Sequence, residues 1–389
     1  MHRARNYGPP RFDIADIVRT HRGALQAQYT LSRPQKRVLS AIELCRTAAL
    51  GGHIDYCETC GYSHPAYNSC RNRHCPKCQA LTQQKWIERR KEKLLPVPHF
   101  HLVFTLPSEL RVLAKARPRA IFHALFAAAS ETLHDLAATH LQANLGITMV
   151  LHTWTRDLRF HPHVHALVTA GGLKKDHSGW KSSHPHYLFP IRMMGALLQG
   201  KMMAALHRLH DKGVFDGFED FDDPEGFDRL MIAIARKKWL VCAKKPFAKV
   251  THVLEYLGRY THRVAISNSR LRKLTTTHVM FSTKNGEHAT LSCIEFLRAF
   301  VQHVLPEKFH KIRHYGLYAG AYCQQLDKAH RLLGTAPRKP KSSLSWAAQL
   351  REVTGRDIGI CPRCGGRLQS LPLARPTARA PPTQLAAAS

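Results

Sequence analysis

Three Cys-x-x-Cys pairs constrain the fold of this 389-residue chain more than any other feature of its sequence. Chance would give about 0.3 such pairs among eleven cysteines, so the repetition calls for a chemical reason. The first two pairs are separated by fourteen residues, close to the spacing of four-cysteine zinc sites, in which each pair makes a tight turn at the metal. We therefore predict one structural zinc ion held by four thiolates: Cys57, Cys60, Cys75 and Cys78.

Other candidate ligands surround these pairs. Cys70 and His74 lie between the first two pairs and could each replace a ligand, but we interpret them as packing residues. The third pair, Cys361 and Cys364, is followed by no cysteine or histidine. It is a zinc half-site whose other half comes from upstream or from another chain, or is missing. The Pro/Ala-rich segment after it, Arg375–Ser389, is expected to be disordered.

The charge of the chain indicates the class of its partner. There are 58 Lys and Arg against 27 Asp and Glu, a net charge of +31, with a pI near 10.1. Such an excess favours a polyanion and makes binding salt-dependent, although a merely well-solvated basic surface is the alternative. No apolar run reaches the length of a membrane span, and no hydrophobic segment follows the first five residues. We expect a cytoplasmic, nucleic-acid-binding protein whose thiols stay reduced.

A second candidate metal site lies in the run His-Pro-His-Val-His at 161–165. His163 and His165 precede apolar, β-branched residues, and in a strand two side chains at i and i+2 point to the same face, where they can share one cation. The chain has 27 histidines, and about two His-x-His triplets are expected by chance. The alternative is therefore an ordinary surface or core pair.

Two phenols lie about 90 residues further along the chain. Tyr256 and Tyr260 are at i and i+4, which places them on one face of a helix, although Gly258 weakens the helix by about 1 kcal/mol relative to Ala. Tyrosines at this spacing more often pack against a core. Paired nucleophiles beside a metal in a basic protein nevertheless suggest transesterification of a nucleic-acid phosphodiester.

These motifs together resemble a known family. His-Pro-His-Val-His, Tyr-Leu-Gly-Arg-Tyr-Thr-His-Arg-Val-Ala-Ile from Tyr256, and Ser-Cys-Arg-Asn-Arg-His-Cys-Pro-Lys-Cys at 69–78 are similar to the two-tyrosine transposases of the insertion-sequence-91 type. That family belongs to the HUH superfamily of single-strand endonucleases. The resemblance covers roughly residues 10–320. It implies an HUH-endonuclease-like central antiparallel sheet, an N-terminal zinc module, and cleavage of single-stranded DNA through a 5′-phosphotyrosine with a free 3′-OH.

Cleavage of a phosphodiester by tyrosine requires an activated phenol and a group that stabilises charge on the phosphate. A phenol with a pKa near 10 requires local activation at neutral pH. A divalent cation (Mg or Mn) held by His163 and His165 would polarise the scissile phosphate. The superfamily completes this site with a third polar ligand, for which the candidates are His152, His161 and Glu255.

Basic residues near both motifs are candidate DNA contacts. The first group follows the zinc motif and the second flanks the tyrosines: Arg71, Arg73 and Lys77, then Arg259 and Arg263. Neutralisation of phosphates is the functional interpretation, and a solvated charged face is the alternative.

Hydrophobic periodicity predicts a mixed fold. Strands are expected over His99–Leu106, Ile147–Trp154 and His163–Ala170, with Pro162 at a sheet edge or strand start. Pro107–Leu145 and Met193–His210 read as mostly helical, the turn Asn285-Gly286 as a hairpin, and Val250–Tyr260 as the tyrosine helix. The fold class is α+β, with an antiparallel sheet and helices preceded by a small zinc-binding module.

We expect three consecutive domains: a zinc- and DNA-binding domain (1–97), a two-tyrosine catalytic domain (98–320) and a basic C-terminal region (321–389). The predicted function is a transposase that nicks and rejoins single-stranded element ends in rolling-circle transposition. A plasmid relaxase or rolling-circle replication initiator would share this chemistry. A zinc-dependent DNA-binding protein without catalysis is the alternative from another class.

Overall fold

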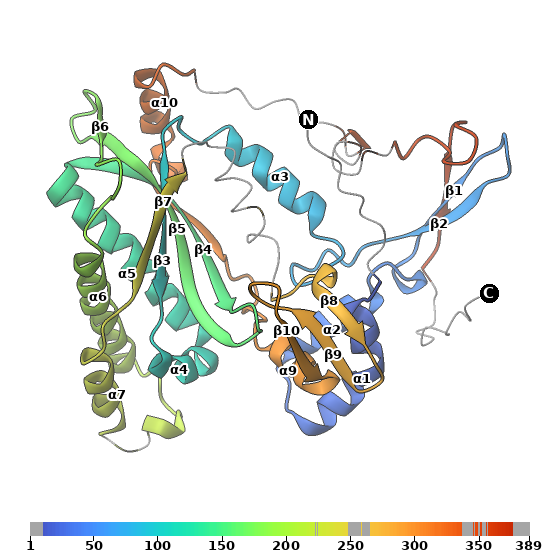
Figure 1. Cartoon of the computed structure of the whole chain (residues 1–389), viewed down its shortest axis with the longest axis horizontal. Helices are drawn as coiled ribbons and strands as arrows, with labels where there is room; N and C mark the ends of the chain where they lie inside the picture. Colours follow the sequence, from blue (N-terminus) through green and yellow to red (C-terminus); the bar gives the residue numbers. More distant parts are fainter. Residues whose placement is uncertain are drawn as a thin grey trace. The chain divides into compact units, whose positions relative to one another are not determined.

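The computed structural model describes residues 11–221, 223, 225–247, 258, 265–336, 345, 347–348, 351, 355 and 357–375 (Figure 1). The chain forms two compact units. The first comprises Met1–Lys85, His262–Val304 and Pro340–Ser389, and the second Trp86–Thr261 and Leu305–Lys339. Each unit is assembled from segments far apart in the sequence. The three consecutive domains expected above stay a prediction.

The regular elements follow in chain order. The α-helices have these bounds: α1 Ile14–Gln28, α2 Arg33–Leu44, α3 Ala80–Lys91, α4 Arg111–Ala116, α5 Pro118–Leu136, α6 Ile191–Asp211, α7 Gly226–Ala235, α9 Cys293–Val301 and α10 Cys323–Leu332. The strands have these bounds: β1 Gly52–Tyr56, β2 Ser63–Tyr67, β3 His99–Thr105, β4 Ala143–Trp154, β5 Phe160–Lys174, β6 Trp180–Ser182, β7 Val241–Phe247, β8 Leu271–Leu274, β9 His278–Ser282, β10 His288–Ser292, β11 Ile312–Gly316 and β12 Gln369–Leu373.

The second unit is built on one antiparallel sheet. Its strand order is β11-β4-β5-β3-β7, and the short strand β6 pairs with the far end of β5. Every pairing in this sheet is antiparallel, and helices lie along it, so the α+β prediction with a central antiparallel sheet is confirmed (Figure 1). β5 lies in the middle of the sheet, flanked on both sides by long strands.

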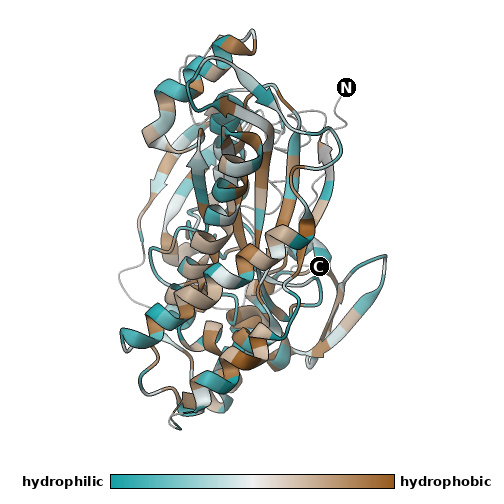
Figure 2. Ribbon diagram, turned by 90° about the vertical axis from the view of Figure 1, so that its left-hand side faces the viewer, coloured by the Kyte–Doolittle hydropathy of each residue, from teal (hydrophilic) through white to brown (hydrophobic). Residues whose placement is uncertain are grey.

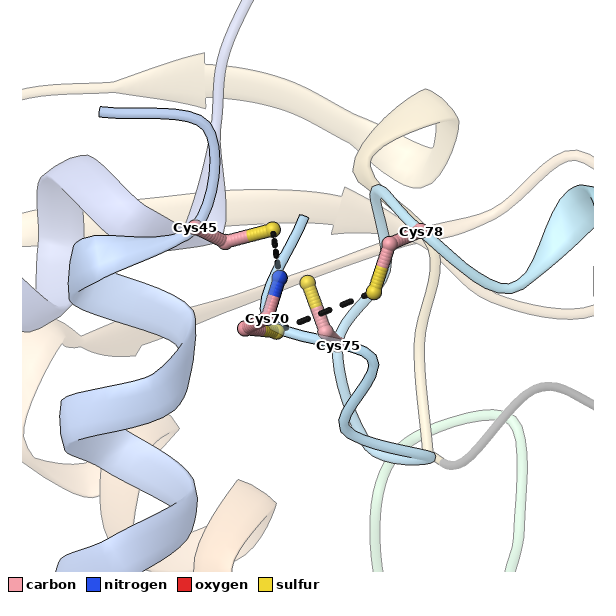
Figure 3. Close-up of side chains that lie close together, drawn as sticks. All are labelled: Cys45, Cys70, Cys75 and Cys78. Atoms are coloured by element: carbon pink, nitrogen blue, oxygen red, sulfur yellow. Dashed lines mark hydrogen bonds between the residues drawn. The ribbon is translucent and has the colours of Figure 1, made fainter. Parts of the chain in front are cut away.

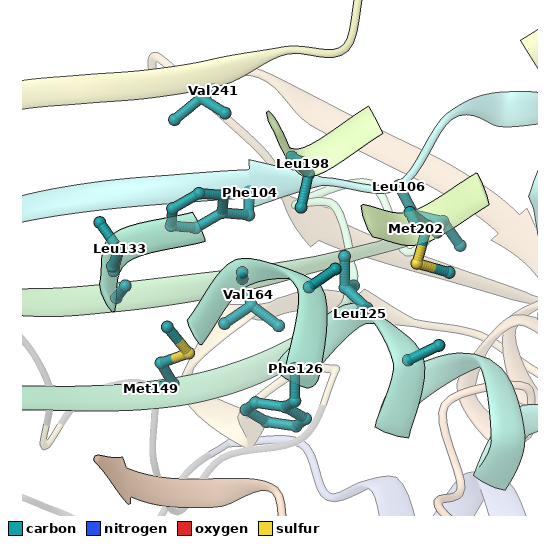
Figure 4. Close-up of a cluster of buried hydrophobic side chains, with 14 of the residues drawn as sticks. Phe104, Leu106, Leu125, Phe126, Leu133, Met149, Val164, Leu198, Met202 and Val241 are labelled. Atoms are coloured by element: carbon teal, nitrogen blue, oxygen red, sulfur yellow. The ribbon is translucent and has the colours of Figure 1, made fainter. Parts of the chain in front are cut away.

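One face of this sheet carries the main core. Alternate residues of the central strands, such as Phe104 on β3, Val164 on β5 and Met149 on β4, pack against Leu125 of α5 and Met202 of α6 (Figure 4). These side chains are almost wholly buried. The helices in front of the sheet in Figure 2 carry hydrophilic residues beside hydrophobic ones, as amphipathic helices covering a sheet do. The period of two along each strand leaves the other face to a different set of residues.

The opposite face of the sheet is partly covered by a smaller core. Leu167 of β5 and Leu326 of α10 belong to it, and Trp86 of α3 packs against it. Two polar groups are buried here as well: the Tyr318 hydroxyl lies 2.8 Å from His99 Nε2 and accepts a hydrogen bond from the Leu95 amide at 3.2 Å. The Tyr318 hydroxyl is thus satisfied by His99 and by the Leu95 amide.

Most predicted elements of this unit are present, with bounds that differ by a few residues from those expected. The predicted strand from His99 ends at Thr105, and the predicted helix from Met193 runs over Ile191–Asp211. The prediction for Pro162 is wrong. It lies inside the central strand β5, in a bulge where β4 and β5 shift register between the pairs His152/His163 and Trp154/Phe160. A bulge tolerates proline because it removes the ladder hydrogen bond that proline cannot donate.

In the first unit, α1 packs against α2 and α9, next to the sheet β10-β9-β8. The predicted hairpin is confirmed, since Asn285 and Gly286 lie in the turn between β9 and β10. Their φ angles of 56° and 83° are both positive, as a type I′ turn requires. Ser292 caps α9 by accepting a hydrogen bond from the Glu295 amide. A separate three-stranded sheet, in the order β12-β1-β2, joins the two ends of the chain.

Within the part of the chain that the structure describes, no helix combines the length and the apolar character needed to cross a bilayer.

Gly316 provides a test of the sheet geometry. It ends β11 with φ of +55°, and a Cβ built there would lie 2.0 Å from the backbone carbonyl oxygen of Leu145. We expect Gly316→Ala to lower the free energy of unfolding by at least about 1–3 kcal/mol, because strain in the left-handed region adds to this clash. Chemical denaturation measures the loss. Gly320→Ala is the matched control, since nothing lies within 4 Å of its added Cβ; equal stability of the two variants would contradict the geometry.

Candidate functional site

The face of the sheet opposite the main core carries a row of histidines. His163 and His165 alternate with core residues along β5, so both imidazoles point to this face. Their Nε2 atoms lie 3.1 Å apart. Two nitrogens bound to one metal at about 2.0–2.1 Å would lie roughly 3–3.4 Å apart. The separation of the two Nε2 atoms falls within this range, and binding of a cation by them stays a prediction.

A third histidine joins this pair from the neighbouring strand. His152 of β4 pairs with His163 in the antiparallel register, and one ring nitrogen from each of His152, His163 and His165 lies within 4.8 Å of the others. Its ring stacks on Trp154 at 4.6 Å between centroids. Of the candidate third ligands, His152 is thus the one that the structure brings to the pair.

The other two candidates lie elsewhere or are not described. His161 Nδ1 accepts a hydrogen bond from Arg111 at 3.0 Å, and its ring nitrogens are not grouped with the other three. Glu255 lies outside the described residues.

Hydrogen bonds orient the ligand-like imidazoles. His163 Nδ1 donates to the His161 carbonyl at 2.6 Å, which leaves Nε2 with its lone pair free to coordinate. His165 Nδ1 lies 2.8 Å from Nε2 of His101, a residue of β3. Metal-binding histidines characteristically use their second ring nitrogen in this way. His101 was not among the predicted site residues. It forms a His-x-His triplet with His99, but only the pairing of β3 with β5 shows that its ring lies next to His165.

The environment keeps these rings neutral. Burial lowers the pKa of His163 to about 4 and holds that of His165 well below its usual range. The pKa of His101 is lowered to about 4 by burial first and then by the positive charge of Lys244, its partner on β7. Neutral imidazole is the form that binds metal ions, so the site is in its ligating state at neutral pH.

Four of the predicted functional residues lie outside the described residues. These are both nucleophile candidates and the two arginines beside them: Tyr256, Tyr260, Arg259 and Arg263. Their roles stay predictions from the sequence.

The cysteines form two four-thiol clusters rather than the one expected. The first combines Cys45, at the end of α2, with three cysteines of the loop before α3: Cys70, Cys75 and Cys78 (Figure 3). The Sγ atoms of Cys70 and Cys78 lie 3.7 Å apart, and the Cys70 amide lies 3.4 Å from Cys45 Sγ. The pKa of Cys45 is lowered because Cys70 hydrogen-bonds to its thiolate, and that of Cys75 is raised by its pairing with Cys45.

The second cluster combines Cys57 and Cys60 with Cys361 and Cys364. The single site predicted from Cys57, Cys60, Cys75 and Cys78 is therefore wrong in its grouping, since the two N-terminal pairs belong to different clusters. The reason is topological: β1 and β2 turn the first pair toward β12, while the loop after β2 carries the second pair toward α2. Treating Cys70 as a packing residue was also wrong, whereas His74 stays outside both clusters, with its Nδ1 3.2 Å from Asn72 Oδ1.

The basic residues of the zinc motif differ in their surroundings. Lys77 forms an ion pair with Asp13, with Nζ and Oδ2 2.5 Å apart. Burial lowers the pKa of Arg73, while Arg71 is exposed. Arg71 is thus the one of the three most accessible to a phosphate, and the DNA-binding role of all three stays a prediction.

Comparison with known proteins identifies two family matches along the chain. Residues 17–106 match a family model described as "Transposase zinc-binding domain", and residues 146–326 match one described as "Putative transposase". The first match contains the cluster at Cys45 and the second contains His152, His163 and His165. No solved structure matches the chain.

Two curated relatives align along most of the chain. "Putative transposase y4qJ" of Sinorhizobium fredii is 41% identical over 368 residues, which cover 90% of this chain and 92% of that protein. "Transposase for insertion sequence element IS801" of Pseudomonas savastanoi pv. phaseolicola is 31% identical over 334 residues, covering 83% of this chain and 80% of the relative. With both family models matched in order and relatives aligned over most of their length, the chain belongs to the transposases of the insertion-sequence-91 type that carry an N-terminal zinc-binding domain.

Proposed function

We propose that this transposase nicks and rejoins single-stranded ends of its element through a covalent 5′-phosphotyrosine, as rolling-circle transposition requires. The observation that carries the proposal is the cluster of His152, His163 and His165 on one face of the central sheet. Three convergent neutral imidazoles on adjacent strands are a donor set for a divalent cation. In a DNA transposase, such a cation would serve phosphodiester cleavage.

The cation site favours particular metals. Imidazole nitrogens coordinate manganese more readily than magnesium, which prefers oxygen ligands, so we expect manganese to support the reaction at least as well as magnesium. When bound, the cation would polarise the scissile phosphate and offset negative charge in the transition state.

The nucleophiles in this proposal are Tyr256 and Tyr260. The phenol oxygen of one tyrosine attacks phosphorus, the bond from phosphorus to the 3′ oxygen breaks, and the 3′ oxygen leaves with a proton. The DNA 5′ phosphate is then held as a tyrosine ester, whose bond energy serves rejoining. A second phenol at i+4 allows another strand to be cut while the first stays occupied.

Charged residues support a DNA strand as the substrate. Lys244 of β7 lies beside His101 on the histidine face, and its positive charge adds to burial in lowering the pKa of His165. A cation there would meet a phosphate directed to the cluster, and the net charge of +31 would favour binding of the polyanion. We assign Arg71, Arg259 and Arg263 to phosphate contacts outside the cluster. Thiol clusters persist in a reducing compartment, so we place this activity in the cytoplasm.

The competing functions differ in one product. A non-catalytic zinc-dependent DNA-binding protein would form no covalent DNA adduct. A plasmid relaxase or replication initiator would form one, but the chain aligns along most of its length with transposases.

The tyrosine assignment predicts loss of adduct without loss of binding. Changing both residues, Tyr256→Phe with Tyr260→Phe, removes two hydroxyls and leaves the rings. Incubation with labelled single-stranded element ends and manganese, followed by denaturing electrophoresis, should show an adduct for the wild type and none for the double variant. Mobility shift on the same DNA should be unchanged. A full adduct yield from the double variant would refute the assignment.

The metal assignment predicts a different phenotype. His163→Ala with His165→Ala should lower cleavage more than about 100-fold, because even residues that only support metal ligands contribute about 10–100-fold. DNA binding should persist, since it rests on phosphate contacts. The control is His184→Ala with His186→Ala, an exposed pair at the same spacing, which should cleave normally. Unchanged cleavage by wild type in EDTA would exclude a metal role.

His101 is predicted to position His165 rather than to touch the substrate. His101→Phe keeps a ring but removes the 2.8 Å hydrogen bond to His165. We expect the manganese concentration for half-maximal cleavage to rise about 10–100-fold, with cleavage largely recovered at saturating metal. His101→Gln, which retains a polar group, should restore part of the affinity. A metal titration identical to wild type for His101→Phe would contradict this role.

A further inference from the structure

We propose that Cys57, Cys60, Cys361 and Cys364 bind a second structural zinc ion, which attaches the C-terminal segment to the N-terminal zinc module. The matched zinc-binding domain ends at residue 106, so it does not include the C-terminal pair. The site shares no cysteine with the cluster at Cys45, and the inference does not depend on the proposed tyrosine chemistry.

The sulfur positions fit a tetrahedral ion. Cys57 Sγ lies 3.5 Å from Cys364 Sγ, and Cys60 Sγ lies 3.7 Å from Cys361 Sγ. All four sulfurs lie within 4.8 Å of one another. Zn–S bonds of about 2.3 Å at tetrahedral angles place sulfurs roughly 3.8 Å apart. None of these cysteines is in a disulfide, and separations of 3.5 Å and more exceed an S–S bond of about 2.05 Å.

The two halves of the site have the same backbone architecture. In the N-terminal half, the Cys57 amide donates to the Tyr62 carbonyl at 2.9 Å and the Gly61 amide donates to the Cys57 carbonyl at 2.9 Å. In the C-terminal half, the corresponding bonds join the Cys361 amide to Gly366 and the Gly365 amide to Cys361.

Each half also turns at a glycine with positive φ, +69° at Gly61 and +75° at Gly365. Two knuckles with the same hydrogen bonds and the same turn are what a four-cysteine zinc site requires. Backbone amides further stabilise thiolate charge, since the N–H groups of Arg363 and Gly366 lie 3.4 Å from the sulfurs of Cys361 and Cys364.

The strand pairing that begins directly beside the site, at Tyr56 and Gln369, agrees with a metal anchor. β12 pairs with β1 from Gly52 opposite Leu373 to Tyr56 opposite Gln369. Four of its five residues are exposed, so β12 buries little apolar surface to hold it in place. A metal ion that binds the folded site supplies this missing free energy, as it does in small zinc modules.

The experiment measures zinc content and strand protection in the full chain. Purified wild type should contain two zinc ions per chain by mass spectrometry of the metal. Cys361→Ser with Cys364→Ser should contain one, and amide exchange of β12 should become fast while that of β9 and β10 stays unchanged. Cys70→Ser with Cys78→Ser should lose the other ion. Cys242→Ser with Cys323→Ser, two exposed cysteines outside both clusters, is the matched control and should keep two.

The outcomes separate the alternatives. A zinc content that is the same in the Cys361/Cys364 variant as in the wild type would overturn the proposal. Should that variant fail to fold, Co²⁺-loaded Cys364→Ser provides a second measurement. Replacing one of eight thiolates should weaken the sulfur-to-cobalt charge-transfer absorption and shift the visible bands of one site. An unchanged spectrum would overturn the proposal as well.

Discussion

The strict alternation of side chains along the central strands is the constraint on which the second unit depends. Even-numbered residues of β3 and β5, such as Phe104 and Val164, build the main core against α5 and α6. Odd-numbered residues of the same strands, His101, His163 and His165, are thereby directed to the opposite face. Because a slip by one residue would exchange the faces, burial of the core also sets the register of the histidines. The packing that stabilises the sheet therefore also fixes the positions of the three histidines.

The features of this arrangement that depend only on residues close together in the sequence could be predicted. His163 and His165 could be placed on one face because their spacing matches the strand period, and the Asn285-Gly286 turn follows from its backbone preferences. Which third imidazole joins the pair depends on strand register, so His152 was only one of three candidates. His101 could not be found without the β3–β5 pairing. The prediction for Pro162 was wrong because a β-bulge accepts proline inside a central strand, and no local sequence pattern indicates that bulge.

For the cysteines, too, the local turns could be predicted from the sequence, but the grouping of distant pairs could not. The Cys-x-x-Cys spacing correctly indicates tight turns and thiolate ligands, in agreement with the matched zinc-binding domain. It carries no information on which turns meet. Cys45 has no partner at that spacing, and its place in a cluster follows only from where α2 ends. Proximity along the chain favoured the wrong grouping, because the sheet β12-β1-β2 brings the third pair from the other end of the chain.

The pairing of β1 with β12 has a consequence for the order in which the protein is made. Cys57 and Cys364 are 307 residues apart, so β1 leaves the ribosome long before its neighbour exists. At roughly 5–20 residues per second, the interval is about 15–60 s. During it the Cys57 and Cys60 thiols have no partner knuckle, and every strand of the sheet of the second unit, from β3 to β11, is synthesised within the same interval. A chain that ended after α10 would keep every strand and the covering core of the histidine face, on a protein whose N-terminal sheet lacks β12.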